Sequence, residues 1–436
     1  MSSQAISPSA SETPTELAEP RFLIARLSVL IFLAFAIMGA WVPVFSLHLK
    51  NLNFSATATA WASAANAIGA LLAPVVWGQV ADRWMPMQRC ISLCALATAG
   101  GLWLMAEVHT AWIMMAACIA MWFFLIPAIG LTTSLTFRQL TDREHEYGKI
   151  RMWGTVGWMA ASWSLTGWLW IERWGGEPES AADFADSLRL GALAALALAV
   201  YAWTLPHTPP MSAAAAPRAW YARLIDAPLS TLHLFEDRSF VVYCVCMFGF
   251  NVTLPFTIQL NPLLLSKLEI DARMSSMCLS IAQSTEVLFL FLLPMLLMRF
   301  GSKAVMIVGG MSWTLGLGLL SVGSPVGLVL ASLLTHGVFI CCFFIAGQVF
   351  VNRLATHDIR ASAQGVLLLI SGSGLLLGHL LVGWLRDATA ENYEAAYGIA
   401  AVTAGILTVI FLIGFSPSPT ILESDQETLV PDSEIP

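Results

Sequence analysis

Apolar runs of about 20 residues recur along this chain of 436 residues. An α-helix needs a run of that length to cross roughly 30 Å of hydrocarbon. Twelve such segments can be delimited, at residues 22–48, 55–80, 89–106, 111–137, 150–171, 187–205, 239–264, 273–298, 303–322, 325–351, 361–385 and 396–415. Charged residues make up 11% of the chain, against about 25% in soluble domains. The sequence therefore predicts an all-α polytopic membrane protein with twelve transmembrane helices.

A polar connection at residues 206–238 divides the predicted helices into six and six. We therefore expect an N-terminal six-helix bundle at 22–205 and a C-terminal six-helix bundle at 239–415, with the connection as a central loop. The tails at 1–21 and 416–436 are rich in Ser, Pro and acidic residues, a composition typical of disordered segments. The first tail lacks the basic region of a cleavable signal peptide.

The distribution of Lys and Arg predicts the orientation of the chain. With a cytoplasmic N-terminus, fifteen of the 21 Lys and Arg residues fall on the inner side and six on the outer side. Inner loops of membrane proteins carry the basic excess. We expect a multi-pass protein of the bacterial plasma (inner) membrane, with both tails and the central loop cytoplasmic, and a monomer as the default assembly.

Several functions are disfavoured by composition and motifs. The net charge of −7 comes largely from the tails and one loop, and no basic stripe indicates nucleic-acid binding. The eight Cys residues lie in or beside apolar segments, where a thiol behaves as a small hydrophobe, and their spacing does not indicate a metal site. No metalloprotease, nucleophile-elbow or phosphate-loop motif is present, so we expect no cofactor and no enzyme activity.

Glu286 is the residue that points most directly to a function. It lies near the middle of the apolar run 274–297, which contains no other charge. A carboxylate at the centre of a bilayer costs roughly 2.5–3.5 kcal/mol on insertion scales, so it is a functional candidate by default. Gln283 precedes it by three residues, which puts both side chains on one helix face. We expect this face to border a cavity or a partner helix.

The fifth predicted helix carries a second polar stripe. Arg151, Thr155 and Trp158 follow one another at i, i+4 and i+7, which aligns them on one face. The stripe offers a cation, a hydroxyl group and an aromatic plane. These groups suit a ligand that has hydroxyls and a flat ring, although a membrane-surface anchor for Arg151 and simple packing for Trp158 are alternatives.

The connection after the second helix contains Gly78, Asp82 and Arg83 in the pattern G-x-x-x-D-R. A weaker echo, Arg299 to Lys303, follows the eighth helix and lacks the Asp. The pattern resembles the signature loop of the major facilitator superfamily, in which it acts as a conformational latch. Gly78 would permit a close helix contact, and Asp82 could sit near Ser362 at the start of the eleventh helix, where free N–H groups favour an anion.

Further strings resemble the bacterial nucleoside:proton symporter family of that superfamily. They are Ile150 to Trp158 (IRMWGTVGW), Gln283 to Glu286 (QSTE), Arg360 to Gly365 (RASAQG), Gly39 to Trp41 and Phe339 to Val351. The resemblance extends from Phe22 to Phe415 and implies a major facilitator fold with proton-coupled nucleoside uptake by alternating access.

The same resemblance implies a site formed by the fifth, seventh, eighth and tenth helices. Its candidate substrate-binding residues are Arg151, Thr155, Trp158, Asn251, Thr257, Gln259, Asn261, Gln283, Glu286, His336 and Phe339. Proton coupling would fall to Glu286, with His336 as a second candidate, because Cys341 stands where some relatives carry an Asp. The seventh helix also departs from the family pattern, since Leu254 and Thr257 align with a Gln/Asn pair.

Alternative functions remain open on the sequence alone. The same fold could carry a sugar or another small polar metabolite, since Trp and Gln side chains suit a saccharide as well. Efflux by proton antiport and a non-transporting receptor are further alternatives. Asn66 in the second helix and His379 in the eleventh could line a cavity or join helices by hydrogen bonds.

Overall fold

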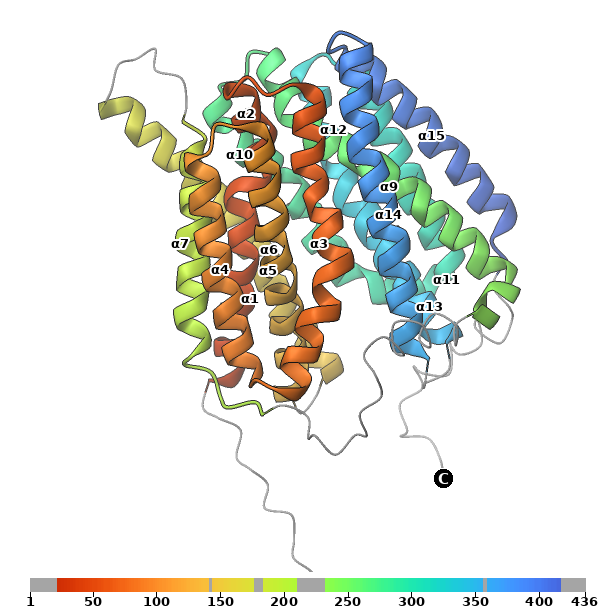
Figure 1. The fold of residues 1–436 in the computed structure, drawn as a ribbon. Coiled ribbons are helices and arrows are strands. Elements are labelled where there is room, and N and C mark those ends of the chain that lie inside the picture. The colour runs from red at the N-terminus through yellow and green to blue at the C-terminus, as the bar shows by residue number, and fades with distance from the viewer. Residues whose placement is uncertain (1–21, 141–142, 176–182, 210–231, 356–358, 417–436) are drawn as a thin grey trace, which may run out of the picture.

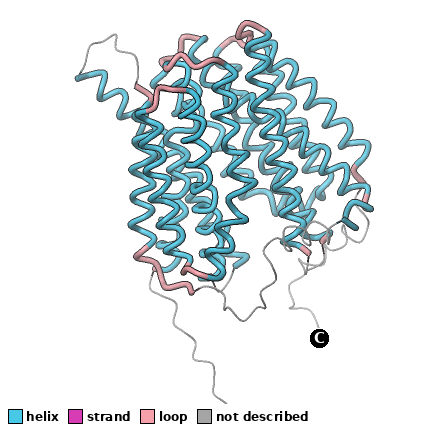
Figure 2. Tube along the Cα trace, in the orientation of Figure 1, coloured by secondary structure: helices cyan, strands magenta, loops and turns pink. Residues whose placement is uncertain are grey.

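The structure is a computed structural model that describes residues 22–140, 143–175, 183–209, 232–355 and 359–416. Those residues form helices joined by short connections, without a strand among them (Figure 2). The predicted tails and most of the predicted central loop lie outside this part of the chain.

The first half of the described chain contains six long helical segments. They are α1 (Leu23–Trp41) continued by η1 (Val42–Val44) and α2 (Phe45–Asn51), α3 (Ala56–Arg83), α4 (Met87–Glu107), α5 (Ala111–Gln139), α6 (Arg143–Gly175) and α7 (Ala185–Ala202). The break between α1 and α2 coincides with Pro43, which lacks an N–H group and so cannot continue an α-helical ladder.

The second half contains five long helical segments, one of which covers two predicted helices. They are α9 (Arg238–Lys267), preceded by η2 (Leu232–Glu236); η3 (Ala272–Met274), α10 (Ser275–Leu279) and α11 (Ile281–Val322); α12 (Val326–Phe339), the π-helical η4 (Ile340–Ile345) and α13 (Ala346–Leu354); α14 (Arg360–Ala388); and α15 (Tyr393–Gly414). Gly301 interrupts α11 with non-helical backbone angles, so that α11 contains both the eighth and the ninth predicted helix.

Buried apolar side chains form two large clusters, one within the first half and one that joins the second half to η1, α2, α6 and Phe184 of the first. In the first half, α1 and α6 approach closely through glycines. A Cβ on Gly39 would overlap the backbone of Trp158, and one on Gly157 would overlap the carbonyl of Phe32. Small residues let helix backbones approach in this way inside a membrane. The division into two bundles with the expected boundaries stays a prediction.

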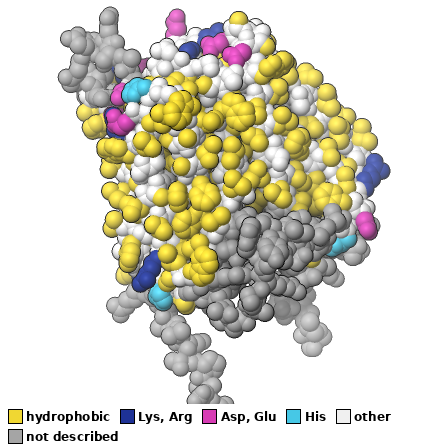
Figure 3. Space-filling view, in the orientation of Figure 1, with side chains coloured by type: hydrophobic (Ala, Val, Ile, Leu, Met, Phe, Trp, Pro, Cys, Tyr) yellow, Lys and Arg dark blue, Asp and Glu magenta, His cyan; other side chains and the backbone are white. Residues whose placement is uncertain are grey.

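The two ends of the molecule can be told apart in Figure 1. One, which we call the α2 end, carries α2, α10 and the connection between α14 and α15. At the other, the terminal end, α1 begins and α15 finishes. Apolar side chains cover the middle of the face in Figure 3, and charged ones lie along its edges, several of them at the top. Nine helical segments of the described chain are long and apolar enough to cross a membrane.

Candidate functional site

A cavity of about 330 Å³ lies between the two halves. The first half contributes side chains from α1, η1, α3, α5 and α6, and the second half contributes side chains from α9 to α12, η4 and α14. Three indole rings form much of its wall, those of Trp122, Trp158 and Trp313. Both halves therefore supply aromatic surface to the cavity.

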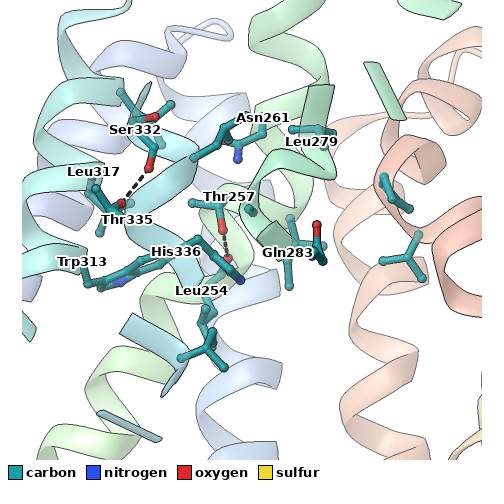
Figure 4. A pocket seen from close by; sticks show the side chains of 18 of the residues that line it. Leu254, Thr257, Asn261, Leu279, Gln283, Trp313, Leu317, Ser332, Thr335 and His336 are labelled. Carbon is teal, nitrogen blue, oxygen red and sulfur yellow. Dashed lines mark hydrogen bonds between the residues drawn. The ribbon is translucent and has the colours of Figure 1, made fainter. Parts of the chain in front are cut away.

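One face of α9 supplies four of the side chains that the second half contributes. Leu254, Thr257, Ile258 and Asn261 follow the i, i+3, i+4, i+7 pattern of a single helical stripe and all line the cavity. The Oδ1 atom of Asn261 accepts a hydrogen bond of 2.6 Å from the hydroxyl of Tyr397. That bond fixes the side chain and leaves its amide N–H₂ group able to donate to a ligand (Figure 4).

Gln283 and His336 complete the polar part of the wall (Figure 4). The amide of Gln283 is best oriented with its nitrogen donating to the carbonyls of Leu279 and Ser280, both at 3.2 Å, so its oxygen remains an acceptor. The imidazole of His336 has no hydrogen-bond partner among the described residues. Both side chains can therefore bond to a molecule in the cavity.

Trp313 is held in place by contacts on several sides. Its indole N–H donates to the hydroxyl of Thr253 at 2.8 Å. Its ring stacks on Phe339 at 4.5 Å and meets the edge of His336 at 5.4 Å. A ring fixed in this way offers a flat apolar surface without losing side-chain entropy on binding. Phe339 thus supports the wall from behind, fully buried, and does not line the cavity itself.

The two predicted charges lie beside the cavity, toward the terminal end. α11 begins and α6 ends at the α2 end. Glu286 follows Gln283 by one helical turn and Arg151 precedes Trp158 by two turns. Both charges therefore lie nearer the terminal end than Gln283 and Trp158 do. The guanidinium of Arg151 lies 4.3 Å from the centre of the Phe35 ring, and its Nη1 atom is buried without a partner. A Cβ on Gly154 would stand 2.9 Å from that nitrogen, so the glycine makes room for it.

Glu286 forms no hydrogen bond or ion pair through its carboxylate within the described chain. Its backbone nitrogen packs against Gly337, and its carbonyl accepts a bond of 3.4 Å from the thiol of Cys341. Arg151 is nonetheless the charged group that acts on it electrostatically. A partly buried carboxylate and a partly buried guanidinium from opposite halves thus influence each other electrostatically without forming an ion pair.

The remaining predicted binding residues lie in the surrounding packing. Thr155 is buried beside the α1–α6 contact. Asn251 donates to the carbonyl of Met247 at 2.8 Å and to the hydroxyl of Ser371 at 3.2 Å. Gln259 faces away from the cavity and bonds to His379 at 2.8 Å. A direct role for these three in binding stays a prediction.

Among the described residues, the expected close contact at Gly78 is not made, because a Cβ there would meet none of their atoms within 4 Å. The side chains of Asp82 and Arg83 lie outside the described residues. The latch therefore stays a prediction.

Sequence reasoning did not single out Trp122, Trp313, Ser332 or Thr335, which all line the cavity. The chain has 17 Trp residues, so tryptophan by itself carries little information. Ser332 and Thr335 could have been found from the sequence, because they form a polar stripe with His336 at i, i+3 and i+4 on α12. Within the described part of the chain, no group of three or more His, Cys, Asp or Glu side chains could hold a metal ion.

Comparisons with known proteins agree over nearly the whole chain. A family model described as nucleoside H⁺ symporter matches residues 22–420. The putative nucleoside transporter YegT of Escherichia coli K12 is 28% identical over 416 residues, covering 90% of this chain and 94% of YegT. The xanthosine permease of the same organism is also 28% identical, covering 89% of this chain and 95% of the permease. The crystal structure of the nucleoside transporter NupG superposes with a TM-score of 0.76 at 26% identity, covering 91% of this chain and all of that one.

Proposed function

Because this chain belongs to the nucleoside H⁺ symporter family, we propose that the cavity between its halves binds the nucleoside and that Glu286 and Arg151 couple its movement to protons. The predicted family, the major facilitator fold and the function of a proton-coupled nucleoside transporter are confirmed by the matches. The chain is a multi-pass membrane transporter and not an enzyme. The binding site, the coupling mechanism and the orientation are our proposals.

The observation that carries the proposal is the chemistry of the cavity wall. Its volume of about 330 Å³ falls within the roughly 300–1,000 Å³ of small-molecule sites. The rings of Trp158 and Trp313 offer stacking surface for a base, worth roughly 1–3 kcal/mol per base in nucleic-acid complexes. Asn261 can donate a hydrogen bond and Gln283 can accept one, which matches the polar groups of a ribose or a base edge.

The unpaired charges beside the cavity support the coupling mechanism. A carboxylate without a partner is costly in a dry site, and either a proton or an approaching cation removes that cost. In the proposed cycle, Glu286 takes up a proton while the site is open to the outside, and the neutral acid permits the occluded state. When the proton leaves to the inside, the carboxylate is stabilised by Arg151 across the interface between the halves.

The proposed orientation follows from the basic residues. The terminal end carries the excess of Lys and Arg, so it faces the cytoplasm of a bacterial cell and the α2 end faces outward. The protein would work as a monomer in the inner membrane, since one chain supplies both walls of the cavity.

The test is uptake of labelled uridine and adenosine into liposomes that contain the purified protein, with and without an inward proton gradient. Glu286→Gln keeps the size and polarity of the side chain but cannot change its charge. We expect this variant to lose gradient-driven accumulation by at least tenfold while it retains exchange of uridine between equal pools. Gradient-driven accumulation at the native level would contradict the mechanism.

Two controls sharpen this test. Glu269→Gln removes a carboxylate in the connection that follows α9, away from the cavity, and we expect native accumulation. Competition of uridine uptake by adenosine, free base, ribose and a disaccharide separates a nucleoside site from a sugar site. Inhibition by the disaccharide without inhibition by adenosine would assign the cavity to a saccharide.

A further inference from the structure

A second, smaller chamber of about 50 Å³ adjoins the main cavity on the side of the α2 end. Val42, Asn66, Trp122 and Ile258 line both spaces, so these four side chains form a common wall. The chamber also lies between the two halves, because α1, α2, α3 and α5 supply one side of it and α9 and α14 supply the other.

The chamber is lined by polar side chains whose hydrogen-bonding capacity is only partly used. Trp41, Ser46 and Gln259 are each less than 5% exposed. The indole Nε1 of Trp41, the hydroxyl of Ser46 and the amide oxygen of Gln259 are buried without a partner. Buried polar groups are almost always hydrogen-bonded, to protein or to a bound molecule. All three residues line the same small space, so a polar molecule bound there would supply partners for these groups.

The available groups define the chemistry of that ligand. The indole N–H of Trp41 only donates, the amide oxygen of Gln259 only accepts, and the hydroxyl of Ser46 does both. The amide nitrogen of Gln259 is already held by His379, through Nδ1 at 2.8 Å and the carbonyl at 3.3 Å, which fixes the oxygen as the free atom. A neutral hydroxyl group can donate one hydrogen bond and accept others, so it can pair with all three of these groups. An ion is a poorer ligand, because no Lys, Arg, Asp or Glu side chain of the described residues lines the chamber.

Asn66 connects the chamber with the main cavity. It lines both, is partly exposed to them, and has no hydrogen-bond partner among the described residues. We propose that the chamber is a hydroxyl-binding subsite: it takes a hydroxyl of the bound substrate, and water when the main cavity is empty. This inference rests on the proposed function of the main cavity. A volume of about 50 Å³ holds one or two water molecules or one hydroxyl-bearing group.

Two substitutions remove a hydrogen-bonding atom and keep most of the side-chain volume. Trp41→Phe deletes the indole N–H, and Ser46→Ala deletes the hydroxyl. Matched controls exist elsewhere in the chain: Trp77 and Ser302 are also buried with an unpaired Nε1 or Oγ, but they line neither space. Trp77→Phe and Ser302→Ala therefore reproduce the same chemical change away from the chamber.

The measurement is inhibition of labelled uridine uptake by 2′-, 3′- and 5′-deoxyuridine. If a substrate hydroxyl enters the chamber, the native protein discriminates against one of the three analogues, because the missing hydroxyl leaves the site unpaired. We expect Trp41→Phe and Ser46→Ala to reduce that discrimination by at least fivefold, through weaker binding of uridine, and the two controls to preserve it.

A crystal structure with and without uridine distinguishes the two sources of the hydroxyl. One outcome is that water occupies the chamber in both structures while the variants discriminate among the three deoxyuridines as the native protein does. That result assigns the chamber to solvent alone and overturns the substrate subsite. An empty chamber with the same unchanged discrimination overturns the proposal altogether. Failure of the native protein to take up uridine at all would instead count against the proposed function, so the two outcomes are separable.

Discussion

The packing between α3 and α14 differs along its length. At the α2 end, a Cβ on Gly383 would overlap the Cβ of Ala60 and lie 3.1 Å from the carbonyl of Ala56. Near the middle, one on Gly372 would lie 3.1 Å from Leu71. Toward the terminal end, one on Gly365 would meet no atom of the described residues within 4 Å. The two halves thus meet closely at one end and diverge toward the other, as a carrier open to one side requires.

Polar side chains reinforce the closed end. Thr57 donates to Asp387 at 2.6 Å, and Trp163 donates to Ser280 at 2.9 Å, each bond joining the two halves. Lys50 lies 3.9 Å from Glu391, which also binds Arg386. These contacts lie on the surface or at its edge, where each contributes little. Glycine packing therefore provides the close approach, and weak polar pairs leave it reversible.

The largest effect is expected from a bulky side chain at Gly383, where α14 packs closely against α3. Gly383→Leu would force α3 and α14 apart, since overpacking costs about 1–3 kcal/mol and the opposing atom here belongs to a neighbouring helix. We expect uridine uptake to fall at least tenfold, with the variant still present in the membrane. Gly365→Ala, at the open end of the same helix, is the control and should fold and melt like the native protein. Native uptake by Gly383→Leu would show that the α2 end does not need this contact.

An intermediate effect is expected from the hydrogen bond between Thr57 and Asp387. Thr57→Val replaces the hydroxyl by a methyl group and removes roughly 0.5–1.5 kcal/mol from the closed α2 end. The population open at that end should then rise roughly two- to twelvefold. Spin labels at Thr110 and Ala388, in a background without native cysteines, would report it as a longer distance between the halves. An unchanged distance distribution would show that this hydrogen bond does not help to keep the α2 end closed.

The smallest effect concerns Glu391 and pH. Burial alone would raise the pKa of this carboxyl, but hydrogen bonds from Arg386 and Tyr393 and the charge of Lys50 outweigh it and lower the pKa below 4.5. A lowered pKa stabilises the folded protein at neutral pH, and the stabilisation is lost as the pH falls below 4.5. With about half of the side chain exposed, it amounts to no more than about 1 kcal/mol.

Melting temperatures in detergent would test this. Glu391→Gln should melt slightly below the native protein at pH 7, and the two should converge below pH 4.5. Glu269→Gln, which alters a carboxyl in the connection after α9, should follow the native curve throughout. A constant difference between Glu391→Gln and the native protein across the range would exclude titration of Glu391 as the cause.

Much of the candidate site was within reach of the sequence. The stripe of Leu254, Thr257 and Asn261 on α9 follows from helical periodicity, and so does the pairing of Gln283 with Glu286. Periodicity also separates Gln259 from Asn261: two residues correspond to about 200° around a helix, so the two amides face opposite sides. Periodicity does not give which side borders which cavity, and therefore Gln259 could not be assigned to the second chamber.

The sequence by itself determined that the chain is a polytopic helical membrane protein, because run length and the scarcity of charge leave a membrane-spanning helix as the stable choice. Its motifs also indicated the family. Only the tertiary structure decided that Trp122 and Trp313, far apart in the chain, line one cavity, and that Arg151 and Glu286 influence each other without forming an ion pair. Those facts depend on how helices from two halves pack, and packing is set by contacts between residues that are distant in sequence.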